Sequence, residues 1–347
     1  MDGKVHPLRG VIALDNEISH EIQRIYRALA DDKSKEIYKH RLLFSLTGEK
    51  AEIAKMVQEC SPQIAHFENK DFCFWGAGAG AHWLVRYMNQ DAFVIDSNKS
   101  GTIEGHPIIT FEEFLAMPDC HNYIVIITVG KEAARSEIAS LLDRHGLDYL
   151  FGYGGLDAED VQYFDLPQLQ LGDEYFVDVG ALDGETTKHF LEHFSGGHAY
   201  VFEPSAAQYE AMKKELKVYG GATELFPYGL YDRNGTVRFS TCGYDAGSAR
   251  VSKTGDTSIK VRRMDDVLIG KRVTFIKMDI EGSELAALKG AEQIIRTQKP
   301  KLAICVYHKP EDIWEIPGLI LDYVPEYRLY LRHYSITNTE TVLYAIP

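Results

Sequence analysis

Two carboxylates and two imidazoles in the C-terminal half are side chains of the types that move protons. Asp279 and Glu281 directly follow an apolar segment (273–278). Being two residues apart, they would point to one side of an extended chain. His308 ends a second apolar segment, and His333 stands in a short one near the C-terminus. Imidazole titrates near neutral pH, so the four residues predict general acid–base catalysis, with Asp279 and His308 as the favoured pair.

Each of these residues also has a plainer structural interpretation. Glu281 could cap the following helix or pair with Lys277, and a single histidine often only satisfies backbone groups. The four side chains could also hold a divalent cation. However, no H-x-x-x-H pattern or neighbouring pair of acids lies close by, and Asp265-Asp266 is remote in the sequence. We therefore expect no required metal.

A glycine loop stands at the start of the same half. The segment FVDVGALDGETT (176–187) is typical of a strand, a glycine loop and a helix, and VFEP (201–204) ends the next strand. Asp178 and Glu203 would thus lie at the carboxyl ends of adjacent strands, where open α/β sheets bind ligands. The candidate ligand contacts are Asp178, Gly180, Ala181, Gly184, Thr186, Glu203 and, as a weaker candidate, Gly229 at the third strand.

A second glycine loop lies further toward the N-terminus, in FCFWGAGAGA (72–81). Gly76, Gly78 and Ala81 match G-x-G-x-x-A, and Asp96 follows Gly76 by 20 residues. This pattern is typical of dinucleotide sites, in which a pyrophosphate meets a helix N-terminus and the acid binds ribose hydroxyls. The glycines could equally serve only to form the turn. Both interpretations stay open, and the nucleotide site is tentative.

The elements that must position these residues fall into three stretches. Residues 1–70 are predicted as a helical N-terminal segment. Residues 71–152 alternate three strands with helices, which predicts a Rossmann-like parallel sheet of the nucleotide-binding type. Residues 172–347 repeat that alternation over five strands, carry a hairpin within 235–263, and end in two more strands. The sequence therefore predicts an α/β fold with two Rossmann-like units.

The C-terminal motifs together resemble a known family. FVDVGALDGETT, VFEP, FIKMDIEGSELAALKGAE, KLAICVYH and the closing RHY…ETVLYAIP are similar to the FkbM family of S-adenosylmethionine-dependent methyltransferases. Leu182 departs from the polar residue that many members have in this loop. The resemblance implies the class I methyltransferase sheet of seven strands over 172–347, and it looks looser over the N-terminal extension.

The resemblance also implies a cofactor and a reaction. S-adenosylmethionine has no phosphate, so a loop that admits a ribose and an amino acid suits it. Asp178 would face the cofactor's amino group and Glu203 would hold both ribose hydroxyls. The implied reaction is O-methylation of a hydroxyl on a sugar or glycan-related small molecule. The motifs D-x-E-G, YH and RH supply Asp279, Glu281, His308 and His333 as its catalytic residues.

Charge and composition exclude several other classes of protein. The balance of 37 basic against 51 acidic residues gives a net charge of −14, which disfavours nucleic-acid and membrane-surface partners. The five cysteines include no CxxC pair, and the N-terminus lacks the apolar core of a signal peptide. We therefore expect a cytoplasmic protein with a small-molecule or glycan substrate, possibly a homo-oligomer.

A second functional hypothesis uses the other glycine loop. The chain could be a nucleotide- or sugar-nucleotide-binding protein, or an oxidoreductase, that works from Gly76–Ala81 and has a non-catalytic C-terminal domain. This hypothesis lacks a Tyr-x-x-x-Lys motif or another hydride-transfer pattern, whereas the C-terminal motifs are intact. The methyltransferase hypothesis is therefore favoured.

Overall fold

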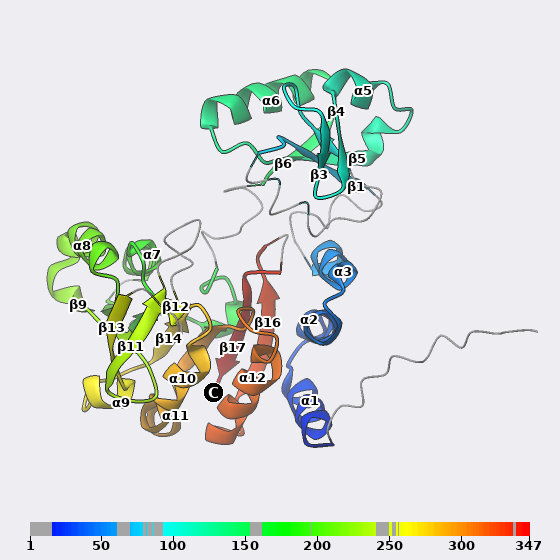
Figure 1. Ribbon diagram of the computed structural model, residues 1–347. Coiled ribbons are helices and arrows are strands. Elements are labelled where there is room, and N and C mark those ends of the chain that lie inside the picture. Colours follow the sequence, from blue (N-terminus) through cyan, green and yellow to red (C-terminus); the bar gives the residue numbers. More distant parts are fainter. Residues whose placement is uncertain are drawn as a thin grey trace, which may run out of the picture.

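The computed structural model describes residues 16–60, 70–78, 81, 85, 93–152, 162–194, 196–240, 250–251, 255, 257–335 and 338–347. Three β-sheets organise these residues (Figure 1). No helix in the described ranges is long and apolar enough to cross a lipid bilayer.

The largest sheet has seven strands in the order β16-β17-β15-β14-β7-β8-β9. The five strands from β15 to β9 in this order run parallel to one another, and β17 is antiparallel to both β15 and β16. The α/β fold and the seven-strand sheet predicted from the sequence are confirmed. The strands are β7 (Tyr175–Val179), β8 (His198–Phe202), β9 (Thr223–Phe226), β14 (Phe275–Met278), β15 (Lys301–Cys305), β16 (Arg328–His333) and β17 (Thr341–Ile346).

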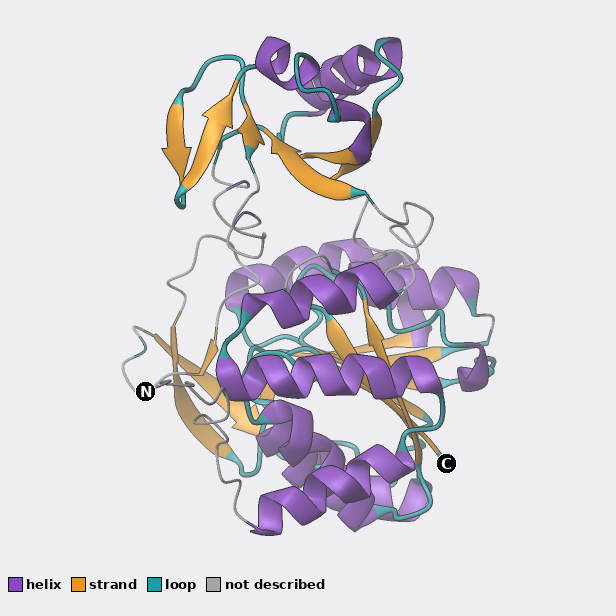
Figure 2. Ribbon diagram, turned by 90° about the vertical axis from the view of Figure 1, so that its right-hand side faces the viewer, coloured by secondary structure: helices purple, strands orange, loops and turns teal. Residues whose placement is uncertain are grey.

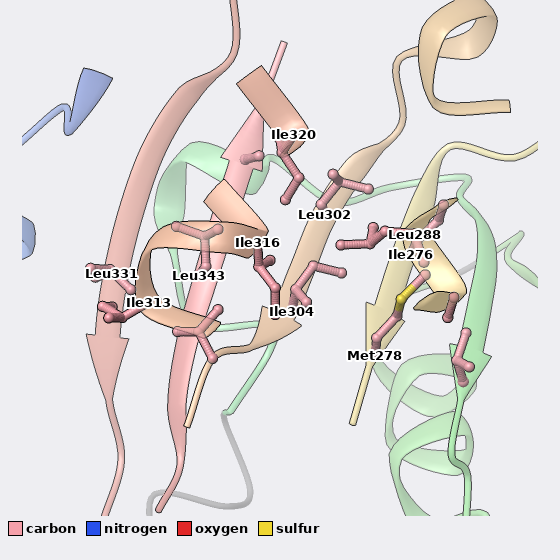
Figure 3. Packing of buried hydrophobic residues seen from close by; sticks show 14 of the residues in the cluster. Ile276, Met278, Leu288, Leu302, Ile304, Ile313, Ile316, Ile320, Leu331 and Leu343 are labelled. Carbon is pink, nitrogen blue, oxygen red and sulfur yellow. The ribbon is translucent and has the colours of Figure 1, made fainter. Parts of the chain in front are cut away.

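The strands of this sheet are buried on both faces, so side chains alternate between two apolar clusters. Ile276 and Met278 point into one cluster with Leu302 and Ile304, where helices α10 and α12 cover them (Figure 3). Phe275 points to the opposite face. The helices around the sheet are α7 (Glu185–His193), α8 (Ala206–Glu215), α9 (Met264–Val267), α10 (Glu284–Lys289), α11 (Glu292–Gln298) and α12 (Asp312–Tyr323), with 3₁₀ turns η2 (Pro167–Leu169) and η3 (Leu216–Ala222).

The hairpin expected within 235–263 belongs to a small sheet of its own. Strands β11 (Gly235–Ser240) and β13 (Thr257–Arg262) pair antiparallel, as predicted. Strands β10 (Gly229–Leu230) and β12 (Arg250–Val251) extend them into the order β10-β13-β11-β12. This sheet follows β9 in the chain and therefore lies beside the edge where the main strands end.

The N-terminal Rossmann-like unit has six strands rather than the three that alternation predicts, in the order β3-β4-β2-β1-β5-β6. The missed hairpin turns at Glu104-Gly105, both with positive φ, a turn signal that the predicted pattern overlooked. Figures 1 and 2 show this unit set apart from the seven-stranded sheet. Its elements are β1 (Asp71–Trp75), β2 (Val94–Ile95), β3 (Gly101–Ile103), β4 (His106–Ile109), α5 (Phe111–Leu115), η1 (Cys120–Asn122), β5 (Tyr123–Ile127), α6 (Glu132–Arg144) and β6 (Asp148–Phe151).

The helical N-terminal segment packs on the outer strand of the seven-stranded sheet. It consists of α1 (Asn16–Ala28), α2 (Asp32–Thr47) and α3 (Lys50–Cys60), which contact β16 and α12. Ser34 accepts a hydrogen bond from the backbone N–H of Leu331 at 2.9 Å, and Arg332 pairs with Asp31 at 2.7 Å. Partial burial opposes ionisation of Asp31, but the hydrogen bonds from Arg332 and Ser34 lower its pKa to about 2.

Removing the Ser34 hydroxyl should weaken the attachment of this segment to the sheet edge. Ser34→Ala leaves the buried N–H of Leu331 without its partner, so we expect the free energy of unfolding to fall by about 1–3 kcal/mol. Urea denaturation followed by circular dichroism measures the loss. Ser140→Ala, which changes an exposed helical serine, should shift stability by less than about 0.5 kcal/mol. Equal stability of both variants would contradict this role of Ser34.

Candidate active site

The loop between β7 and α7 lies tightly against the loop that follows β14. Gly180 has φ +82°, and a Cβ at this position would lie 2.0 Å from the carbonyl oxygen of Asp279. The backbone N–H groups of Gly180 and Ala181 donate to the carbonyl of Phe202 at the end of β8, at 3.1 and 3.2 Å. Position 180 therefore requires glycine, because any side chain would displace the backbone that carries Asp279.

Asp178 and Lys277 form a buried ion pair beneath this loop. They are register partners on β7 and β14, and their Oδ1 and Nζ atoms lie 3.1 Å apart. Lys277 also donates to the Gly180 carbonyl at 2.8 Å, and Thr187 donates to Asp178 Oδ2 at 2.7 Å. Burial alone would lower the pKa of Lys277, but the carboxylates of Asp178 and Asp279 raise it. Both Asp178 oxygens thus have partners inside the protein, and its contact with a cofactor stays a prediction.

Glu203 follows β8 at the same sheet edge and is buried. Its Oε2 accepts from the backbone N–H of Leu182 at 3.1 Å and its Oε1 from that of Ser205 at 2.8 Å. Burial raises the pKa of Glu203 to about 6, although these two hydrogen bonds act in the opposite direction. A carboxylate oxygen has two lone pairs, so each can accept one further hydrogen bond. A diol could therefore bind both oxygens at once.

The remaining predicted cofactor contacts lie around this loop. Gly184, with φ +91°, begins α7 and packs against α8. Thr186 is half-buried in the first turn, whereas its neighbour Thr187 makes the hydrogen bond to Asp178. Gly229 lies near Pro204, the residue after Glu203: a Cβ on it would be 3.8 Å from the proline ring. All three predicted residues thus border the same sheet edge.

Backbone strain marks both loops of this edge. Leu182 has φ +51° in the loop after β7, and Glu281 has φ +55° in the loop after β14. A left-handed conformation costs a residue with a side chain about 1–3 kcal/mol, and such residues cluster at functional sites. The surrounding packing must therefore hold both loops in place.

Two tyrosines hold the carboxylate of Asp279. Tyr163 donates to Oδ2 at 2.9 Å, and the hydroxyl of Tyr307 lies 3.4 Å from Oδ1. Tyr307 also donates to the buried Glu340 at 3.0 Å. Burial, together with the charge of Asp279, raises the pKa of Glu340 to about 7. The ring of Tyr163 covers Lys277, with Nζ 5.3 Å from its centre, so Tyr163 contacts both the Asp178 pair and Asp279.

His308 lies among three carboxylates. Its Nδ1 is 3.0 Å from Glu284, and its Nε2 is 3.4 Å from Asp279 and 3.7 Å from Glu281. Burial would lower the pKa of His308, but Glu284, Asp279 and Glu281 raise it to about 10. The near-neutral titration expected from the sequence is therefore wrong for His308 in this arrangement of charges.

The N-terminal segment supports the strand end that carries His308. Arg41 of α2 is buried, and its guanidinium donates to the carbonyl of Tyr307 at 3.0 Å. The same group donates to the carbonyl of Asn338 in the β16–β17 turn at 2.5 Å. The helical segment thus contacts the backbone on both sides of the candidate site.

His333 lies at the same sheet edge but on the outermost strand, β16. Its Nδ1 is 2.9 Å from the hydroxyl of Thr341, its register partner on β17. The structure thus brings Asp279, Glu281 and His308 together and places His333 two strands away from β15. A catalytic role for His333 stays a prediction.

A cavity of about 450 Å³ opens beside His308. One wall is the loop after β14 together with α10, and it includes Glu281 and Lys289. The opposite wall comes from the small sheet and its approach, with Tyr231 and Asp232. Lys309 closes the cavity near His308. Its lining is therefore mixed: an aromatic ring, acids and ammonium groups.

In the second glycine loop, in the N-terminal unit, the residues that match the nucleotide-binding pattern contact other parts of the same unit. Asp96 accepts from the backbone N–H of Ala77 at 2.7 Å and from those of Asn98 and Lys99. Gly76, with φ +115°, would place a Cβ 2.7 Å from a side-chain carbon of Val129. These contacts favour a structural role for Gly76 and Asp96. Among the described residues, no atom lies within 4 Å of a Cβ placed on Gly78, and Ala81 is buried. A nucleotide at this loop stays a prediction.

Sequence reasoning missed several polar residues of the site. Lys277, considered only as a partner of Glu281, is a charged residue within an apolar strand, a pattern that indicates a buried ion pair. Glu284 is the third acid of D-x-E-x-x-E and was readable as such. Tyr163 reaches Asp279, and Glu340 reaches Tyr307, only through the tertiary fold, and no local pattern marks either residue.

The contact at Gly180 gives a direct test of this geometry. Gly180→Ala must displace the Asp279 backbone, so we expect a loss of about 2 kcal/mol or more in the free energy of unfolding. Gly172→Ala is the matched control, since it has open space and an ordinary φ. Urea denaturation of both variants measures the difference. Wild-type stability of Gly180→Ala would show that the two loops are not in contact.

Comparisons with known proteins agree with this geometry. Residues 178–335 match the family model described as "Methyltransferase FkbM domain". The 2-O-methyltransferase NoeI of Sinorhizobium fredii (strain NBRC 101917 / NGR234) is 23% identical over 186 residues, covering 46% of this chain and 75% of that protein. The crystal structure of methyltransferase FkbM from Methylobacillus flagellatus KT has a TM-score of 0.50 and 22% identity, covering 95% of this chain and 99% of that one. Residues 178–335 of this chain are therefore similar to the methyltransferase domain of the FkbM family, in a chain whose fold is also found in the solved FkbM structure.

Proposed function

We propose that this protein transfers the methyl group of S-adenosylmethionine to a hydroxyl of a sugar or glycan-related small molecule. The family match supports methyl transfer, and the printed activity of the NoeI relative supports oxygen as the acceptor atom. One structural observation carries the proposal. The strand-end carboxylate of Glu203 and the Asp279–His308 pair lie at one sheet edge, and a cavity adjoins His308.

The residues at the ends of β7 and β8 suit the cofactor. Glu203 can accept one further hydrogen bond on each oxygen, as a ribose diol requires. Gly180 and Gly184 leave the loop without side chains where the ligand would approach. The ion pair of Asp178 and Lys277 lies directly beneath this loop. When bound, S-adenosylmethionine supplies a methyl group on a positively charged sulfur.

The residues beyond β14 and β15 suit the acceptor side of the reaction. An acceptor in the cavity would lie against His308 and Glu281, next to Asp279. Asp279 would accept the proton of the hydroxyl, while Tyr163 keeps its carboxylate in one orientation. The mixed lining, with the ring of Tyr231 opposite polar side chains, suits a polyhydroxylated molecule better than an apolar one.

The first prediction concerns the cofactor. Glu203→Ala should weaken S-adenosylhomocysteine binding by roughly 1.5–3 kcal/mol for each charged hydrogen bond that is lost, about 10- to 150-fold per bond. Since the charged carboxylate is the better acceptor, wild-type affinity should also fall as pH drops through about 6. Isothermal titration calorimetry between about pH 5 and 8 measures both effects.

Two variants serve as controls for this prediction. Glu185→Ala removes an exposed acid from the first turn of α7 and should leave affinity unchanged. Gly78→Leu, in the N-terminal unit, should also leave it unchanged. Binding of NAD with no binding of S-adenosylhomocysteine would overturn the proposed function. An equal loss of affinity in Glu203→Ala and Gly78→Leu would show one composite site.

The second prediction concerns the proton. Asp279→Asn should lower turnover about 10²–10⁴-fold, because a positioned base contributes that much, while cofactor affinity stays near wild type. Transfer of tritium from labelled S-adenosylmethionine to a panel of methyl glycosides and oligosaccharides measures turnover. His333→Ala is the comparison variant and should retain activity if it only supports the hairpin. Full activity of Asp279→Asn would place the base elsewhere.

A further inference from the structure

The Nε2 atom of His308 has an unusual environment. The side chain is only 7% exposed, and within the described residues Nε2 has no hydrogen-bond partner of acceptable geometry. Two carboxylate oxygens face it instead, Asp279 Oδ1 at 3.4 Å and Glu281 Oε2 at 3.7 Å. A buried polar atom without a partner needs an explanation, because leaving it so costs free energy.

The spacing of these atoms resembles that of ligands around one ion. With metal–ligand bonds of about 2.0–2.2 Å, neighbouring ligand atoms lie roughly 3–3.5 Å apart. The Nε2–Oδ1 distance falls in this range, and the Glu281 oxygen, 3.7 Å from Nε2, lies just outside it. Ligand atoms of Asp279, Glu284 and His308 lie within 4.8 Å of one another, whereas Glu281 reaches only His308 at the edge of this group. One imidazole and two carboxylates leave coordination positions open toward the cavity, which Glu281 and His308 both line.

Glu284 lies next to the other ring nitrogen of His308, Nδ1. It is fully buried, lies 3.0 Å from His308 Nδ1, and is itself fixed by the backbone N–H of Ile280 at 2.8 Å. Histidine ligands of metals commonly donate their second N–H to a carboxylate. Glu284 is close enough for this role, although among the described residues Nδ1, like Nε2, makes no hydrogen bond of acceptable geometry. Its other oxygen, Oε2, has no hydrogen-bond partner among the described residues.

The charge of the cluster also favours a cation. Three carboxylates face one imidazole, at 3.0 to 3.7 Å from its nitrogens. The nearby ammonium of Lys309 donates to the carbonyl of Gly282, and that of Lys277 pairs with Asp178. Buried charges are normally paired or coordinate metals.

We propose that Asp279, Glu281 and His308 bind a divalent first-row cation such as Mn²⁺ or Zn²⁺, with Glu284 orienting the imidazole. An imidazole ligand favours these ions over Mg²⁺ and Ca²⁺. Its role in catalysis rests on the proposed function: a cation here would polarise an acceptor hydroxyl in the cavity and lower its pKa. The proposal replaces the expectation, drawn from the sequence, that no metal is required.

The test uses the full chain, stripped with EDTA, desalted and titrated with MnCl₂ or ZnCl₂ alone. The titration is done near pH 8, because metal binding displaces the proton from Nε2. Free Mn²⁺ is followed by electron paramagnetic resonance, and Zn²⁺ by calorimetry. We expect one saturable site. His308→Ala and Asp279→Asn should weaken it at least 100-fold, and Glu284→Gln about 10- to 100-fold.

Controls separate this proposal from the proposed function. Glu185→Gln removes an exposed acid and should leave metal affinity unchanged. Circular dichroism checks that each variant is folded, and Glu281→Gln, at a partly exposed side chain, gives a second variant if His308→Ala fails to fold. No saturable binding of either ion, or unchanged affinity in the folded ligand variants, would overturn the metal site. Metal binding without any S-adenosylhomocysteine binding would overturn the proposed function instead.

Discussion

The contact between two strand-end loops is the constraint on which the site depends. β7 and β14 are neighbours in the seven-stranded sheet, and the loops that follow them meet where Gly180 lies against the carbonyl of Asp279. Beneath this contact, the Asp178–Lys277 pair joins the same two strands and also holds the Gly180 carbonyl. In the proposed function, one loop would carry the cofactor and the other would carry the carboxylate that accepts the proton. Their separation is thus set by buried backbone rather than by mobile side chains.

Segments that precede β7 in the chain also support this edge of the sheet. α2 is attached to β16 through Ser34, and Arg41 binds the carbonyl of Tyr307, the residue before His308. Tyr163, which precedes β7, donates to Asp279 and covers Lys277. Residues outside the 178–335 span that matches the family model therefore complete the site. This placement means that the helical segment supports the backbone beside the candidate site as well as the edge of the sheet.

The sequence predicted the fold of the C-terminal half well, because each strand is a short apolar run that ends in a polar residue at the binding edge. The sequence also predicted that Asp279, Glu281 and His308 lie close together, since they follow the consecutive strands β14 and β15. It missed β3, β4 and β6, which are short and carry little alternation. It also missed the charge around His308: the raised pKa comes from Glu284, Asp279 and Glu281 converging in space, and no single segment shows that convergence. Tyr163 and Glu340 lie far from Asp279 in the sequence and could not be predicted from it.

The central claim is that the carboxyl edge of the seven-stranded sheet binds S-adenosylmethionine, with its acceptor site beside His308. A crystal structure of the protein grown with S-adenosylhomocysteine tests it most directly. The account predicts electron density along the Gly180–Gly184 loop, with both ribose hydroxyls on Glu203 and the sulfur directed toward Asp279. Density at the Gly76–Ala81 loop instead, with the edge formed by β7, β8 and β14 empty, would contradict it.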